Sequence, residues 1–132
     1  MPSTTAEHAL RAVIYLSRQP TGQLISADEL ADAIGAPRNY LSKTLNALVK
    51  AGIAVSAAGR YGGFAIARPP NRITLDMVVR VFDGRAPQPR CMLGDRPCDS
   101  RNPCKAHQRW AAIDQAYAEA LRTTTVSDLI TG

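Results

Sequence analysis

Apolar positions in the N-terminal part of the chain recur at helical spacing and predict three successive helices. The first ends before Pro20, and its inner face has the i, i+3, i+4, i+7 spacing of Leu10, Val13, Ile14 and Ser17. The second begins at Ser26, because Ser26-Ala27-Asp28-Glu29 has the form of a capping box, and it ends at Gly35. Its expected buried residues are Leu30, Ala33 and Ile34. The third runs to about Lys50, is stopped by Gly52, and has an inner stripe of Leu41, Leu45 and Leu48 with Thr44 beside it.

The residues after the third helix predict a β-hairpin. Residues 53–55 and 64–66 alternate as short strands do, and residues 56–63 form a glycine-rich loop between them. Three helices followed by a two-stranded ribbon with a basic tip is the element order of a winged helix-turn-helix.

The C-terminal half is expected to contain two more helices. Thr74 is a suitable N-cap for a fourth helix that ends at Gly84, with an apolar face of Leu75, Val78, Val79 and Phe82. Asn102-Pro103 is a typical helix start, and the long helix that follows runs to about Arg122. Near-heptad spacing is shared by Trp110, Ile113, Tyr117 and Leu121. Because little chain remains to cover this stripe, a second copy of the protein is the expected partner.

Together these elements predict a mainly α fold with a small β-hairpin. Residues 1–84 form the winged helix-turn-helix, 85–103 a cysteine loop, and 104–132 a dimerisation helix with a C-terminal turn. A chain of 132 residues with 45% hydrophobic content suits one compact domain. No apolar run approaches the roughly 18 residues of a membrane span, and the N-terminus lacks the features of a secretory signal. A cytoplasmic protein is expected.

Positive charge is concentrated in one segment. The chain has 16 Lys and Arg against 11 Asp and Glu, a net charge of +5. Residues 33–75 contain no acidic residue and six basic ones, so this segment carries +6 and the remainder of the chain carries −1. Such a distribution favours a polyanionic partner such as DNA.

The third helix is the expected recognition helix, because the second helix of a helix-turn-helix lies in the major groove. With its leucines inward, its outward side chains can bond bases or phosphates, and none is a carboxylate that would repel phosphate. The predicted DNA contacts are Arg38, Asn39, Ser42, Lys43, Asn46 and Lys50 on this helix, with Arg60 and Tyr61 at the hairpin tip. A solvated helix face on a basic protein is the alternative.

The only cysteines, Cys91, Cys98 and Cys104, lie close together in the sequence. An odd, clustered set argues against a disulfide framework and for thiolate chemistry. Thiolates bind zinc or iron–sulfur centres, and gaps of six and five residues are wider than the knuckles of structural zinc sites. A loop around a larger inorganic core is favoured; a zinc site, free surface thiols and a peroxide-type thiol switch are the alternatives. His107 follows Cys104 by one helical turn, with a plain surface histidine as the alternative.

Several motifs together resemble the IscR/NsrR-type winged-helix regulators. They are Tyr40-Leu41-Ser42-Lys43, Ala51-Gly52-Ile53, Gly59-x-x-Gly62-Gly63-Phe64 followed by Ala67-Arg68, Ile73-Thr74-Leu75 and the cysteine triad. The resemblance covers nearly the whole chain. It implies a homodimeric transcription factor that binds double-stranded operator DNA, carries an iron–sulfur cluster and forms its dimer interface with the long last helix.

The resemblance also implies a set of cluster ligands. Cys91, Cys98 and Cys104 match the family's cluster cysteines, and His107 matches the fourth ligand of the cluster-assembly repressor. In the nitric-oxide-sensing repressor an N-terminal carboxylate before Ala-Leu-Arg takes that place, and Glu7 is similar to it. His107 is preferred here, because one helical turn joins it to Cys104. The implied cofactor is a 2Fe–2S cluster, with 4Fe–4S as the alternative.

The expected function is a transcriptional regulator, with repression favoured, that senses redox state, nitric oxide or iron–sulfur status. The cluster would set the angle between two winged heads and so the spacing of two half-sites. The alternative is a cluster-free DNA-binding regulator with a zinc site or a small-molecule ligand. An enzyme is not expected, because the sequence shows no nucleophile–base pair and no phosphate-binding glycine motif.

Overall fold

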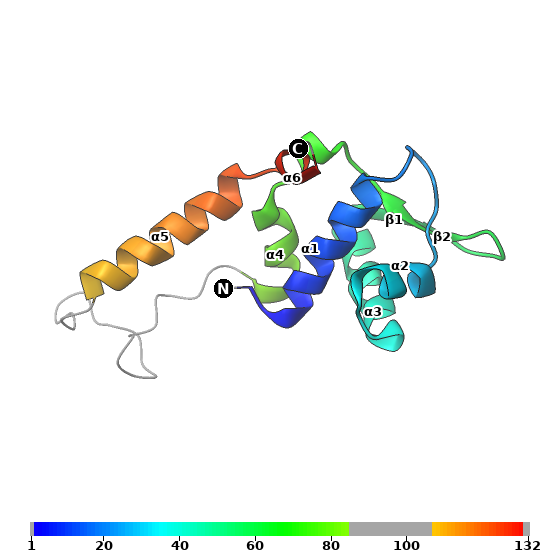
Figure 1. Ribbon diagram of the computed structural model, residues 1–132, viewed down its shortest axis with the longest axis horizontal. Helices are drawn as coiled ribbons and strands as arrows, with labels where there is room; N and C mark the ends of the chain where they lie inside the picture. The colour runs from blue at the N-terminus through cyan, green and yellow to red at the C-terminus, as the bar shows by residue number, and fades with distance from the viewer. Residues whose placement is uncertain (1, 85–106, 131–132) are drawn as a thin grey trace.

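The computed structural model describes residues 2–84 and 107–130 of the chain. Six α-helices, a 3-10 turn and a two-stranded antiparallel sheet make up this part, a mainly α fold with a small β-hairpin as predicted (Figure 1). In chain order the elements are α1 Thr4–Ser17, α2 Ala27–Ile34, α3 Arg38–Lys50, β1 Ala54–Ala57, β2 Gly63–Ile66, η1 Pro70–Arg72, α4 Leu75–Asp83, α5 His107–Thr123 and α6 Val126–Ile130.

The helix boundaries follow from caps that the sequence predicts. The Ser26 hydroxyl accepts the Glu29 amide at 3.1 Å at the start of α2, and Thr74 accepts the Met77 amide at 3.3 Å at the start of α4. Both bonds satisfy a backbone donor that the first helical turn leaves without a partner. Gly35 ends α2 with φ 73°, a left-handed conformation that glycine adopts without strain.

The core lies between α1, α2, α3 and α4. Leu41, Leu45 and Leu48 of α3 are fully buried, and Thr44 beside them is 3% exposed, so the predicted stripe of α3 is confirmed. Thr44 donates its hydroxyl hydrogen bond to the Tyr40 carbonyl at 3.3 Å, which satisfies the one polar side chain in the stripe.

The predicted inner faces of α1 and α2 are wrong in part. In α1 the most buried residues include Ala9 and Ala12, whereas Leu10 and Ile14 are only half-buried. In α2, Ala31 is buried and Ala33 is exposed. The reason is close packing: α1 is in contact with α2, α3, α4, α6 and β2 at once, and small side chains permit that approach while larger ones fill its flanks. The predicted burial of Leu30 is confirmed.

The hairpin forms the wing; β1 begins one residue later than the sequence predicts, and β2 begins one residue earlier. Ala54 pairs with Ile66 and Ala57 with Gly63, while Ile53 lies buried just before β1. Ile25 extends the sheet by a bridge to Phe64, with amide–carbonyl distances of 2.9 and 2.8 Å. A Cβ at Gly63 (φ 153°) would lie 2.5 Å from the Ile25 carbonyl oxygen, so only glycine permits this approach.

The C-terminal residues return to the winged-helix core. Val126 of α6 is fully buried, and its amide donates to the Ile73 carbonyl at 2.8 Å. A bridge between Thr74 and Thr125 lies beside this contact. Between α4 and α6, α5 packs against α4 and then extends away from the body of the molecule (Figure 1). Among the described helices, none combines the length and the apolar character that crossing a membrane requires.

Candidate nucleic-acid interface

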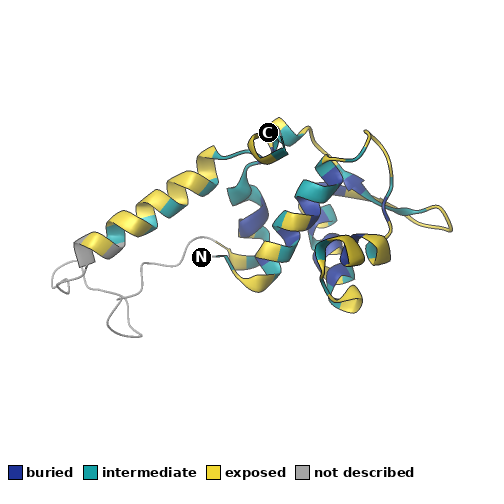
Figure 2. Ribbon diagram, viewed as in Figure 1, coloured by how far each residue is buried: buried dark blue, intermediate teal, exposed yellow. Residues whose placement is uncertain are grey.

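α3 presents a polar face opposite its buried leucines. The side chains of Asn39, Lys43, Asn46 and Lys50 are exposed, and Ser42 is half-buried at the edge of this face. In Figure 2 the ribbon of α3 carries both exposed and buried residues. The predicted DNA-facing residues of the helix therefore lie where a ligand can reach them.

The first turn of α3 is electrostatically suited to an anion. Pro37 is its N-cap and provides no side-chain hydrogen bond to the amides of the first turn. Those amides and the helix dipole favour negative charge at this end. The first turn carries Arg38 and no acidic residue, which adds to the same preference.

The tip of the wing carries the other two predicted contacts. Tyr61 is 85% exposed, and the guanidinium carbon of Arg60 lies 5.8 Å from the centre of its ring. This is within the range of a cation–π contact, so the two side chains form one basic, aromatic projection. The turn below them is closed by the Gly62 amide, which donates to the Gly59 carbonyl at 3.0 Å.

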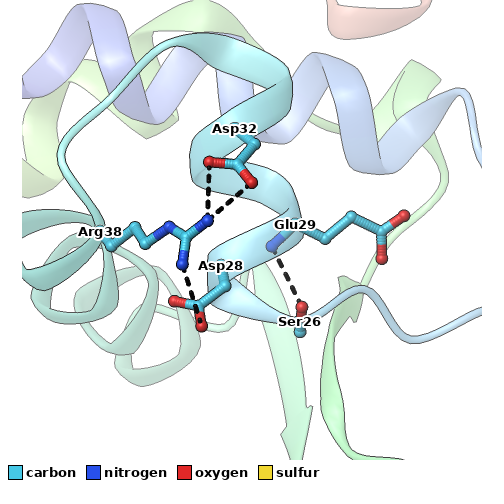
Figure 3. A network of polar contacts seen from close by, with 5 residues as sticks. All are labelled: Ser26, Asp28, Glu29, Asp32 and Arg38. Carbon is cyan, nitrogen blue, oxygen red and sulfur yellow. Dashed lines mark hydrogen bonds and ion pairs between the residues drawn. The ribbon is translucent and has the colours of Figure 1, made fainter.

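None of the outward side chains of α3 is a carboxylate, but two carboxylates of α2 lie beside one of them. Nη2 of Arg38 lies 2.9 and 3.2 Å from the two carboxylate oxygens of Asp32, and Nη1 lies 3.9 Å from Asp28 (Figure 3). The hydrogen bond and charge of Asp32, then the charge of Asp28, raise the pKa of Arg38. Residues 33–75 lack acids, but folding places the α2 carboxylates against the first residue of α3.

This ionic cluster of Arg38, Asp28 and Asp32 was not predicted from the sequence. The available signal was the i, i+4 spacing of the two aspartates, which places them on one face of α2. The missing information was the tight turn through Gly35, which brings Arg38 back toward that face.

The predicted cluster ligands are placed only in part. Cys91, Cys98 and Cys104 lie outside the described residues, and His107 is the first residue of α5. Glu7 is exposed in the first turn of α1. Within residues 2–84 and 107–130, no three His, Cys, Asp or Glu side chains are grouped so that they could hold a metal ion.

The start of α1, the helix that carries Glu7, is bonded to the end of α4. The Ser3 amide and hydroxyl donate to the Asp83 carboxylate at 2.9 and 2.5 Å, which fixes the start of α1 to the last residue of α4. Burial, then the charges of Asp83 and Glu7, raise the pKa of Tyr117 on α5. Parts of α1, α4 and α5 therefore meet around these acidic side chains.

The family profile described as "Rrf2: Iron-dependent Transcriptional regulator" matches residues 2–132. The chain belongs to the Rrf2 family. Its members are transcriptional regulators and not enzymes, and the winged helix is their DNA-binding fold. This confirms the predicted family resemblance and fold class.

Individual relatives agree with the Rrf2 assignment. A putative HTH-type transcriptional regulator of Aquifex aeolicus (strain VF5) is 31% identical over 130 residues, 97% of this chain and 90% of that protein. The structure of CymR, the global cysteine regulator of B. subtilis, matches with a TM-score of 0.79 and 26% identity over 99% of this chain and 96% of that one. IscR of T. potens matches in fold with a TM-score of 0.75 and 23% identity over 98% of this chain and 85% of that one.

Proposed function

We propose that this Rrf2-family regulator acts in the cytoplasm as a homodimer that binds duplex operator DNA through α3 and the wing. A cofactor on its cysteine segment would control that binding. The observation that carries the proposal is the exposed polar face of α3, with Lys43 and Lys50, on a helix whose opposite side is locked in the core. A helix held in this way can enter the major groove without losing its own packing.

The proposed contacts divide by chemistry. Asn39 and Asn46 can bond adenine, and Lys43 can bond guanine or phosphate. Ser42 and Lys50 are suited to phosphate, and the wing pair to the backbone or an adjacent minor groove. Arg38 is also bonded to the α2 carboxylates, which compete with DNA for its guanidinium.

The homodimer is proposed from the surface of α5. Ile113 of α5 is 58% exposed, whereas Tyr117 and Leu121 are half-buried. An apolar side chain on a projecting helix favours a second copy of the same helix as its cover. Two wings related by a two-fold axis would then meet two half-sites about one helical turn apart.

The cofactor is proposed to be an iron–sulfur cluster held by Cys91, Cys98 and Cys104. Three thiolates with an imidazole or a carboxylate form a donor set that iron–sulfur clusters accept. The fourth ligand is proposed to be His107, with Glu7 as the alternative; the charge of Glu7 acts on Tyr117 together with that of Asp83, which lies shortly before the segment that carries the cysteines. When bound, the cluster would supply a centre that reacts with oxidants and nitric oxide. The family description as iron-dependent supports this assignment.

A cluster-free regulator with a zinc site or a small-molecule ligand is the second candidate. The observation that favours it is the likeness to the B. subtilis protein named as a global cysteine regulator. In that case the three cysteines of this chain would serve zinc or thiol chemistry.

Anaerobic purification followed by iron, sulfide and zinc analysis tests the cofactor. A coloured protein with matching iron and sulfide supports the cluster, and a colourless one with stoichiometric zinc supports the second candidate. The visible spectrum should change in His107→Ala and stay nearly the same in Glu7→Ala. The reverse pattern would assign the fourth position to Glu7 and leave the cysteines in place.

A further inference from the structure

The guanidinium of Arg38 is turned toward the carboxylates of α2. Its Nη2 is shared between the two oxygens of Asp32, and its Nη1 points at Asp28 (Figure 3). Bidentate contact with guanine uses two N–H groups of the fork on one edge. Here Nη2 is hydrogen-bonded to Asp32 and Nη1 faces Asp28, so a base or a phosphate that binds this edge competes with the two carboxylates.

Asp32 lies at a position in α2 where a negative charge is unfavourable for the stability of the helix. It lies in the last turn of the helix, where the dipole disfavours negative charge and where α2 carries no basic residue. Asp28 and Glu29, in contrast, lie in the first turn, where acids are favourable. The contact that compensates the charge of Asp32 is the one with Arg38, which comes from the next helix.

We propose that Asp32, assisted by Asp28, is an intramolecular competitor for Arg38 that lowers the affinity of the regulator for DNA. The inference rests on the proposed DNA-binding function of α3. Asp32 thereby limits how much Arg38 of the recognition helix contributes to DNA binding.

The competition has a definite sign and a limited size. The three side chains are exposed, from 57% for Arg38 to 69% for Asp28, so the ion pair is weak and a phosphate or guanine can displace it. When Arg38 contacts DNA, the binding free energy is reduced by the cost of breaking its ion pair with Asp32. Asp32→Asn should therefore raise the affinity for DNA about two- to fivefold, the range expected for an exposed pair. If Asp32 instead supported Arg38 in a DNA-binding pose, the same change would lower the affinity.

The measurement is fluorescence anisotropy at one fixed ionic strength with two labelled duplexes. The first is a duplex of about 30 base pairs selected by the wild-type protein from a random library, long enough for two half-sites. The second is a shuffled duplex of the same composition. Asp32→Asn should bind the selected duplex more tightly than wild type. The increase in affinity for the selected duplex should be at least as large as the increase for the shuffled duplex.

Two controls separate the ion pair from general charge. Glu29→Gln removes one negative charge from the same helix, and its carboxylate points away from Arg38 (Figure 3). The second control is a double-mutant cycle with Arg38→Ala. In the Arg38→Ala protein, Asp32→Asn should change the affinity for DNA no more than Glu29→Gln does, because there is no Arg38 side chain left to release.

The outcomes separate the inference from the proposed function. If wild type selects no duplex from the library, the DNA-binding role of α3 itself fails. If a duplex is selected, three results would refute the competition by Asp32. Asp32→Asn could lower the affinity for that duplex, or raise it no more than Glu29→Gln does. It could also raise the affinity equally when Arg38 is already replaced by alanine. Thermal unfolding checks the fold, and Asp32→Asn should keep its Tm within about 4 °C of wild type.

Discussion

Tyr117 is the residue that reports how α5 sits against the rest of the protein. Its hydroxyl lies within electrostatic reach of Asp83 on α4 and Glu7 on α1, and the side chain is half-buried. Burial and both charges disfavour the tyrosinate, so all three raise the pKa of Tyr117. Any displacement of α5 from α4 would weaken all three effects, which makes this pKa a local measure of α5 packing.

Alkaline titration of Tyr117 provides the first prediction at this scale. The tyrosinate absorbance that disappears in Tyr117→Phe should have its midpoint above the ordinary value of about 10. Because the folded-state pKa is the higher one, stability is intact below the unfolded pKa and falls as the pH rises through the folded pKa. Tyr117→Phe should remove that part of the alkaline loss. Asp83→Asn should lower the midpoint without restoring it fully, since burial is the larger cause. A midpoint at or below the ordinary value would contradict this placement of α5.

At the scale of elements, prediction from the sequence succeeded where the local pattern alone decides the outcome. The stripe of Leu41, Leu45 and Leu48 fixes the rotation of α3, because large apolar side chains at helical spacing must be buried. Alanine gives no such signal, since it is tolerated inside and outside. The inner face of α2 was therefore misplaced between Ala31 and Ala33.

Contacts between elements were beyond the reach of the sequence. The ionic cluster depends on the angle between α2 and α3, and the bridge of Thr74 to Thr125 joins residues far apart in the chain. Of the candidate site, the predicted residues of α3 and the wing tip are exposed except Ser42, which is half-buried. Their contacts with DNA, like the ligand roles of the three cysteines, stay predictions.

The role of α3 leads to a prediction about Lys43. Lys43→Ala should weaken binding to the selected duplex, and a lost base contact would reduce discrimination by about 1–3 kcal/mol. If Lys43 contacts phosphate instead, binding should weaken equally on both duplexes, and the slope of log K against log salt should fall by about 0.9. Arg18→Ala is the matched control, because it removes an exposed cation at the C-cap of α1. Equal losses in the two variants would mean that net charge, and not the face of α3, determines binding.

At the scale of the whole molecule, the C-terminal end of α5 is tied to the winged helix. α6 follows it and is held in the core by Val126, while Leu75 donates its amide to the Thr124 carbonyl at 3.0 Å. The rest of α5 leads away from the winged helix toward His107 (Figure 1). α5 therefore joins the DNA-binding winged helix to the cysteine segment. Such a helix can transmit a structural change in the cysteine segment to the winged helix, provided that α5 of a second protomer packs against it.

Ile113 tests whether such a second α5 is present. Ile113→Asp replaces the exposed apolar side chain with a charge, which would be buried without a partner at a helix–helix seam. The substitution removes one isoleucine from each protomer at about 1.5–3 kcal/mol apiece, so the dimer dissociation constant should rise at least about a hundredfold. Gln115→Asp is the control, because residue 115 is exposed and polar and lies on another side of the same helix. Sedimentation velocity should show Ile113→Asp shifted toward monomer and Gln115→Asp unchanged. If Ile113→Asp dimerises as tightly as wild type, the dimer interface lies elsewhere. The two wings would then contact the two half-sites in a different arrangement.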